Sequence, residues 1–190
     1  MIIDPVLKYR VVAHTIPPVE SEVITIQPGE HTIIPLITPQ GKLKIILNTK
    51  KDYQFIVRKA GENTTINVQN INKEQNYITG LYDIELLTLP RQYFKDVRIN
   101  QNQLTKLQLP STGLANVLLP ANGYGGVYLN DGDKLEEIYK FNGESNQYKL
   151  TLLPGKYTVI YRAKSSKKYI YSNEKSFTIK SGKSQLIKIY

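Results

Sequence analysis

The sequence predicts an all-β protein that consists of two tandem antiparallel β-sandwich modules. One stretch, in which apolar residues alternate on both sides of a turn, occurs three times, at residues 24–36, 97–109 and 177–189. Turn-forming residues recur at intervals of roughly 8 to 12 residues, as in proteins built from short antiparallel strands. No long amphipathic helix is evident, so parallel strands joined by helical crossovers have no room.

The repeated stretch has the pattern of a β-hairpin. Each copy carries large apolar residues at its first and third positions and again at its eleventh and thirteenth. Between them lies a residue that accepts a positive φ, which is Gly29, Asn102 or Gly182. Because side chains alternate between the two faces of a strand, this pattern predicts a hairpin with one buried face.

A second similarity precedes the first two copies. Residues 8–17 (KYRVVAHTIP) resemble residues 81–90 (LYDIELLTLP), which lie 73 positions further on (81 − 8), and the stretch that follows keeps this offset. A shared period of this length indicates an internal repeat of about 73 residues.

The repeat predicts the domain boundaries. Residues 1–18 resemble the last strand and Pro-Pro linker of an upstream unit, so we expect this chain to be the C-terminal piece of a longer protein. In the alternative, which the sequence leaves open, this strand crosses over to complete the first module. The first module is predicted at residues 19–92 and the second at residues 93–190.

Strands follow from apolar alternation between turn residues. Residues 135–141 (LEEIYKF) also fit a helix, but their counterpart in the first module alternates, so a strand is predicted for both. Pro35 cannot donate to a ladder, which places its strand at an edge or beside a bulge. The further predicted strands are residues 41–47, 53–58, 64–69, 80–86, 113–119, 126–129, 147–152 and 155–162.

Charge is concentrated near the end of the chain. The formal net charge is +9, and residues 164–190 hold seven lysines and one acid, Glu174. An anionic-ligand surface is a candidate there, although lysines on an exposed strand also prevent edge-to-edge association. A solvated strand edge is the favoured interpretation of these residues, with an anionic glycan or lipid headgroup as the alternative partner, and nucleic acid is not an expected partner. The candidate surface comprises Arg162, Lys164, Lys167, Lys168, Tyr169 and Tyr171.

No catalytic constellation is evident, and neither a cofactor nor a metal is predicted. The absence of cysteine excludes disulfides and thiolate chemistry. His14 and His31 lack the spacing of metal ligands or of a general base with its partner. The glycine-rich residues 122–126 precede a strand, not the helix that a phosphate cradle needs, and residues 130–133 (NDGD) fit a hairpin turn better than a calcium loop. A hydrolase that uses residues 123–126 is the weakest alternative.

Several motifs together resemble the C-terminal tail of a group of bacterial von Willebrand factor A (VWA) domain proteins. This resemblance extends over essentially the whole chain. The motifs are YRVVAHTIPP at residues 9–18, IQPGEHT at 26–32, PQG at 39–41, YITGLYDIELLTLP at 77–90, GYGGVY at 123–128, LLPGKY at 152–157 and FTIKSGKSQLIKIY at 177–190.

The resemblance implies transthyretin-like or immunoglobulin-like sandwiches that bind partners or act as spacers between domains, and that do not catalyse a reaction. In that family a VWA domain precedes the tail. Its D-x-S-x-S metal motif is absent here, so no metal-dependent adhesion is expected of these residues. The expected partners are the upstream VWA domain of the same polypeptide and other envelope proteins or glycans, at the periplasmic or surface side of the cell envelope. The alternative function is carbohydrate or anionic-polymer binding through exposed tyrosines and C-terminal lysines.

Overall fold

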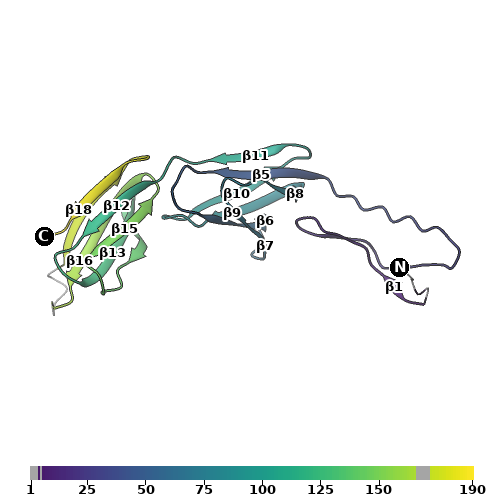
Figure 1. The fold of residues 1–190 in the computed structure, drawn as a ribbon, viewed down its shortest axis with the longest axis horizontal. Coiled ribbons are helices and arrows are strands. Elements are labelled where there is room, and N and C mark those ends of the chain that lie inside the picture. The colour runs from purple at the N-terminus through teal and green to yellow at the C-terminus, as the bar shows by residue number, and fades with distance from the viewer. Residues whose placement is uncertain (1–3, 5, 166–171) are drawn as a thin grey trace. The chain divides into compact units, whose positions relative to one another are not determined.

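The protein is all-β, as predicted. A computed structural model describes residues 4, 6–165 and 172–190, and every regular element within that part of the chain is a strand (Figure 1). The chain divides into two compact units. The first comprises Met1–Ile45, Phe55–Glu85 and Tyr93–Leu107; the second comprises Ile46–Gln54, Leu86–Gln92 and Gln108–Tyr190.

The first sandwich consists of seven strands in two sheets. One sheet has the order β10-β9-β6-β7 and the other β11-β5-β8. Its strands are β5 (Gln40–Ile46), β6 (Gln54–Lys59), β7 (Thr65–Asn70), β8 (Gln75–Ile78), β9 (Gly80–Leu86), β10 (Gln92–Ile99) and β11 (Leu104–Gln108).

The second sandwich repeats this arrangement strand by strand. Its sheets have the orders β14-β13-β16-β17 and β15-β12-β18, so each strand occupies the place of the strand seven positions earlier in the numbering. Its strands are β12 (Gly113–Leu118), β13 (Gly123–Asp131), β14 (Lys134–Lys140), β15 (Gln147–Leu152), β16 (Gly155–Ala163), β17 (Asn173–Ile179) and β18 (Ser184–Lys188). β18 joins β12 in parallel, an exception to the predicted antiparallel pairing.

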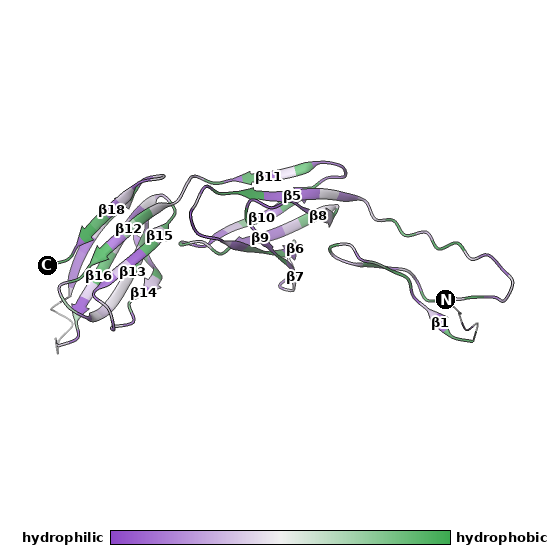
Figure 2. Ribbon diagram, in the orientation of Figure 1, coloured by the Kyte–Doolittle hydropathy of each residue, from purple (hydrophilic) through white to green (hydrophobic). Residues whose placement is uncertain are grey.

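Alternation along the strands supplies each core. In β12, for example, Ala115 and Val117 are buried and Asn116 between them is partly exposed. Figure 2 shows apolar residues interrupted by polar ones along β12, β16 and β18. In the second sandwich one cluster draws buried side chains from both sheets, including Val117, Val127 and Val159. Burial of such side chains contributes about 1.5–3 kcal/mol each.

An equivalent tyrosine anchors the start of β9 and of β16. The Tyr82 hydroxyl donates to the carbonyl oxygen of Ile78, and the Tyr157 hydroxyl donates to that of Leu153, both at 2.6 Å. Each ring is buried, so the hydrogen bond satisfies a hydroxyl that would otherwise lack a partner. Burial raises the pKa of both hydroxyls.

A third buried tyrosine bridges the two sheets of the first sandwich. The Tyr77 hydroxyl of β8 accepts from Asn67 Nδ2 at 2.7 Å and donates to Gln69 Oε1 at 2.8 Å. Both partners belong to β7, in the other sheet. Burial raises the pKa of Tyr77 to about 12, against the opposing effect of the Asn67 hydrogen bond.

This pKa predicts loss of stability at alkaline pH. The folded-state pKa lies above the unfolded value near 10, so the neutral phenol stabilises the fold fully below pH 10. That contribution should disappear as the pH rises from about 10 to about 12. Urea unfolding midpoints across this range, with tyrosinate absorbance in parallel, test it. An unchanged midpoint while Tyr77 ionises would contradict it, and Tyr77→Phe should have a shallower pH dependence.

The three repeated turns form, but they do not close hairpins within one sheet. Gly29, Asn102 and Gly182 have φ of 78°, 56° and 67°. The prediction of a hairpin is nevertheless wrong in both sandwiches, because β10 and β17 belong to the four-stranded sheets whereas β11 and β18 belong to the three-stranded ones. The turn therefore carries the chain from one sheet to the other, which apolar alternation alone does not distinguish from a hairpin.

The first copy differs further. Residues 24–25 form β4 (Ile24–Thr25), but residues 26–39, including Pro35, lie outside the strands. β4 pairs with β1 (Lys8–Tyr9), and β2 (Val12–Ala13) pairs with β3 (Val19–Glu20). Ile26 is half-buried, whereas the equivalent Ile99 and Ile179 are buried.

Other predictions had mixed outcomes. The predicted boundary at residues 92/93 is wrong, because β10 and β11 belong to the sheets of the first sandwich.

The strand at residues 135–141 is confirmed as β14, and β8 was missed because its four residues are too short for a clear alternation. β13 (Gly123–Asp131) is longer than the predicted strand at residues 126–129 and includes most of the glycine-rich stretch. Its pairing with β14 shifts register between Val127 and Tyr128.

Candidate functional site

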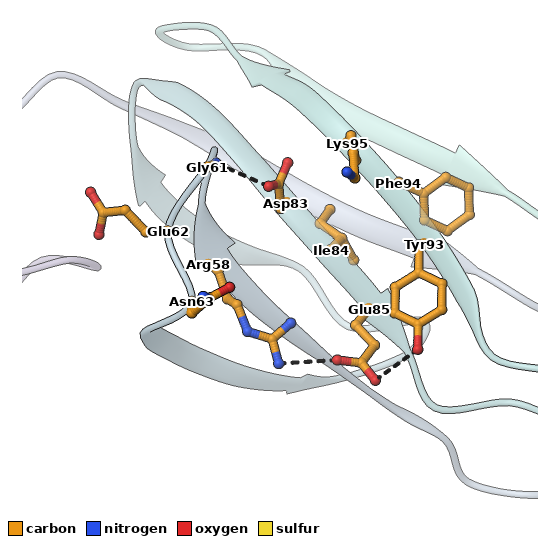
Figure 3. Close-up of a pocket in the computed structure, with 10 residues that line it drawn as sticks. All are labelled: Arg58, Gly61, Glu62, Asn63, Asp83, Ile84, Glu85, Tyr93, Phe94 and Lys95. Carbon is orange, nitrogen blue, oxygen red and sulfur yellow. Dashed lines mark hydrogen bonds and ion pairs between the residues drawn. The ribbon is translucent and has the colours of Figure 1, made fainter.

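A groove of about 570 Å³ lies on the four-stranded sheet of the first sandwich (Figure 3). β6, β9 and β10 contribute its walls, and the turn after β6 closes one end. Ten residues line it: Arg58, Gly61, Glu62, Asn63, Asp83, Ile84, Glu85, Tyr93, Phe94 and Lys95.

An ion pair lies at the base of this groove. Arg58 Nη2 of β6 donates to Glu85 Oε2 of β9 at 3.0 Å, and the two side chains are 23% and 9% exposed. The hydroxyl of Tyr93, from β10, lies 3.4 Å from the other carboxylate oxygen of Glu85. Since removing a charge from water is costly, these contacts help to stabilise the buried carboxylate of Glu85.

A second carboxylate, that of Asp83, organises the backbone at the other end. Its two oxygens accept from the amides of Gly61 and Asp96, each at 3.0 Å. The backbone of Asp96, which donates one of these bonds, has a φ of 54°. This conformation is uncommon for a residue other than glycine. The backbone hydrogen bonds from Gly61 and then Asp96 lower the pKa of Asp83.

The second sandwich has different chemistry at the equivalent positions. Thr158, which stands where the first sandwich has Asp83, contacts Asn130 Oδ1 at 2.9 Å and Ser176 Oγ at 3.0 Å. Ile160 stands where the first sandwich has Glu85. The ion pair of the groove is therefore found in the first sandwich and not at the equivalent positions of the second. In both sandwiches, however, the residue after the anchoring tyrosine, Asp83 or Thr158, makes polar contacts to two neighbouring segments.

Two of the three carboxylates that line the groove have hydrogen-bonding partners within the fold. Glu85 faces Arg58, and Asp83 is occupied by backbone amides, so neither carboxylate is positioned as a free general base. Within the described part of the chain, no group of three His, Cys, Asp or Glu residues could hold a metal ion. The contacts of Glu85 with Arg58 and Tyr93 connect the neighbouring strands β6, β9 and β10.

The candidate anionic-ligand surface is only partly described. Arg162 lies near the end of β16, and Lys164 follows it with its amide donating to the Asn122 carbonyl at 3.1 Å. Lys167, Lys168, Tyr169 and Tyr171 lie outside the described residues. The prediction of an anionic-ligand surface therefore stays a prediction.

Charge reversal tests that surface. Lys167→Glu with Lys168→Glu should weaken retention on immobilised heparin by more than about tenfold, because the loss of two attractions of about 1 kcal/mol each in water already exceeds the roughly 1.4 kcal/mol of a tenfold change. Lys134→Glu with Lys140→Glu, on β14, gives the same change of net charge. Equal salt concentrations at elution for both double variants would contradict a localised surface.

The structure also places the other residues that the sequence analysis considered as candidate sites. His14 and His31 are exposed. Residues 130–133 form the hairpin turn between β13 and β14, as predicted, with Asp131 opposite Lys134 and Gly132 at a φ of 61°.

Sequence reasoning missed the residues of the groove. Asp83 and Glu85 alternate along β9, which indicates one polar face of that strand. Nothing in the sequence linked them to Arg58, because that contact depends on how β6 and β9 adjoin in the sheet. Within the part of the chain that the structure describes, no helix is long and apolar enough to cross a membrane.

No protein-family model matches the chain, and no curated protein matches it in sequence. Among solved structures it is similar to the Bacillus anthracis TIE protein, with 16% identity over 96% of this chain and a TM-score of 0.31. It is also similar to GBS52, the minor pilin of the Gram-positive pathogen Streptococcus agalactiae, with 10% identity over 78% of this chain and 94% of the pilin, and a TM-score of 0.39. The chain spans 40% of the TIE protein.

Proposed function

We propose that the chain is a non-enzymatic accessory region of a bacterial VWA-domain protein, which spaces or presents that domain at the cell envelope and binds proteins through its sandwiches. The observation that carries this proposal is the repetition of one sandwich strand by strand, with the same sheet orders and the same anchoring tyrosine. Repetition of a rigid unit lengthens a protein without requiring a reactive centre in any unit.

The charge distribution supports the same role. In the groove of the first sandwich, the buried carboxylate of Glu85 is paired with Arg58, and the carboxylate of Asp83 accepts hydrogen bonds from backbone amides. A catalytic site would instead hold groups whose protonation is poised for transfer.

Cross-linking in the source bacterium tests the proposal. Cells that carry an affinity tag at Tyr190 are fractionated and treated with a short amine-reactive cross-linker, and the cross-linked peptides are identified. We expect the protein in the envelope fraction, linked to a D-x-S-x-S-containing domain of its own polypeptide and to other envelope proteins. Recovery in the cytosolic fraction without such links would contradict the proposal.

A further inference from the structure

The segment of residues 8–37 repeats the last part of each sandwich. Tyr9 pairs opposite Ile24, as Tyr157 pairs opposite Phe177 in the second sandwich. The Thr15 hydroxyl donates to the Pro17 carbonyl at 2.7 Å, and the equivalent Thr88 hydroxyl donates to the Pro90 carbonyl at the same distance.

The turn that follows is also the same. In all three copies an amide donates to the carbonyl three residues earlier, next to the residue of positive φ. These bonds run from Glu30 to Gln27 (3.2 Å), from Gln103 to Asn100 (3.3 Å) and from Lys183 to Lys180 (3.1 Å).

In both sandwiches the first strand covers this turn. The Gln103 carbonyl accepts from the Lys42 amide of β5 at 2.8 Å, and the Lys183 carbonyl accepts from the Leu114 amide of β12 at 2.9 Å. Beside each amide is a glycine, Gly41 or Gly113, that lies directly against the turn. This turn therefore accommodates a first strand that has glycine at its first or second position, as in β12 and β5.

The same core positions are less covered in residues 8–37. Val11 is 39% exposed, whereas the equivalent Ile84 and Val159 are 2% and 0% exposed. Tyr9 and Ile26 are half-buried, although their counterparts in both sandwiches are buried. The apolar side chains that complete a core are thus present without the strands that cover them elsewhere in this chain.

We propose that residues 8–37 are the closing part of a third sandwich, and that Tyr9, Val11 and Ile26 are the docking surface for one occupant: a four-stranded β segment of this same repeat. Its strands have the order and alternation of β12–β15, and its first strand begins with glycine. This inference is independent of the envelope role.

Pro35 agrees with that occupant. Its equivalent in the second sandwich is Lys188, in β18, which pairs in parallel with β12. The Ile189 amide donates to the Leu118 carbonyl at 2.9 Å. Because successive amides of a strand point in opposite directions, the Lys188 amide faces away from β12. A proline at this position loses no hydrogen bond to the incoming first strand.

A fusion tests the proposal. Residues 111–154 of this chain are joined directly before Leu7, in the relation that they have to Gly155, and amide hydrogen exchange is compared with that of the unextended full chain. We expect exchange of the amides at residues 9–13 and 24–36 to slow about 100-fold, because they enter a cooperative unit. Unchanged exchange would overturn the proposal.

Two matched variants separate docking from general stabilisation. Replacing the appended glycine that corresponds to Gly113 by valine should abolish the protection, since a side chain there collides with the turn. Val11→Asp should also abolish it in the fusion, while leaving the midpoint of thermal unfolding of the unextended chain unchanged. Full protection in either fusion variant would contradict the proposed docking surface.

Discussion

Replacement of Gly113 by alanine is expected to destabilise the second sandwich by about 2–3 kcal/mol. A Cβ at this position would lie 2.5 Å from Ile179 Cγ2, 2.7 Å from the Lys183 carbonyl oxygen and 2.8 Å from that of Lys180. Two of these three neighbours are backbone atoms of the repeated turn, which cannot move aside as a flexible side chain could. Urea unfolding followed by tyrosine fluorescence measures the loss.

The first sandwich offers the parallel change and its control. In Gly41→Ala the new methyl group would collide with the Asn100 carbonyl oxygen and lie 2.8 Å from Ile99 Cγ2. A comparable loss is expected. In Gly80→Ala the nearest atom, Cε2 of Tyr82, lies at 3.6 Å, so that variant should change stability little. Equal stability of all three variants and the wild type would contradict close packing of the first strand on the turn.

Removal of the Arg58 side chain is expected to destabilise the first sandwich by about 2–3 kcal/mol. Loss of one partner of a fully buried ion pair costs about 3–5 kcal/mol, and Arg58 is partly exposed, so a smaller value is expected. The cost arises because Arg58→Ala leaves Glu85 buried without its cationic partner. Chemical unfolding at neutral pH measures it.

An exposed ion pair of the same residue types supplies the control. Arg10 Nη1 lies 2.7 Å from Glu20 Oε2, with side chains 53% and 49% exposed. Arg10→Ala should cost less than about 1 kcal/mol, because water screens the pair. In Arg58→Ala, a second change of Glu85→Leu should recover part of the lost stability by removing a buried charge that no longer has its arginine partner. If Arg58→Ala costs no more than Arg10→Ala, the burial of Glu85 does not depend on this pair.

The sequence was sufficient to predict the strands with clear alternation. β5, β9 and β15 follow the predicted ranges to within one residue, and the turn residues Gly29, Asn102 and Gly182 have the positive φ that their types suggested. Local patterns such as these depend on side-chain size and backbone freedom, both of which are written in the sequence.

Sheet membership could not be read in the same way. Alternation around Gly182 is identical whether β17 and β18 share a sheet or lie in two, and only the pairing of β18 with β12 decides between them. The same is true of Arg58 and Glu85, which are 27 residues apart in the chain and meet because of how the sheet is ordered. Contacts between distant segments therefore account for what the sequence left unpredicted.

The most direct test of the repeated sandwich is the set of nuclear Overhauser effects from its two glycines. We expect strong effects between the Gly41 Hα protons and the Ile99 γ2 methyl, and between the Gly113 Hα protons and the Ile179 γ2 methyl. Absence of both, together with cross-strand Hα–Hα effects between β17 and β18, would show that the turn closes a hairpin within one sheet and would contradict the two-sheet arrangement.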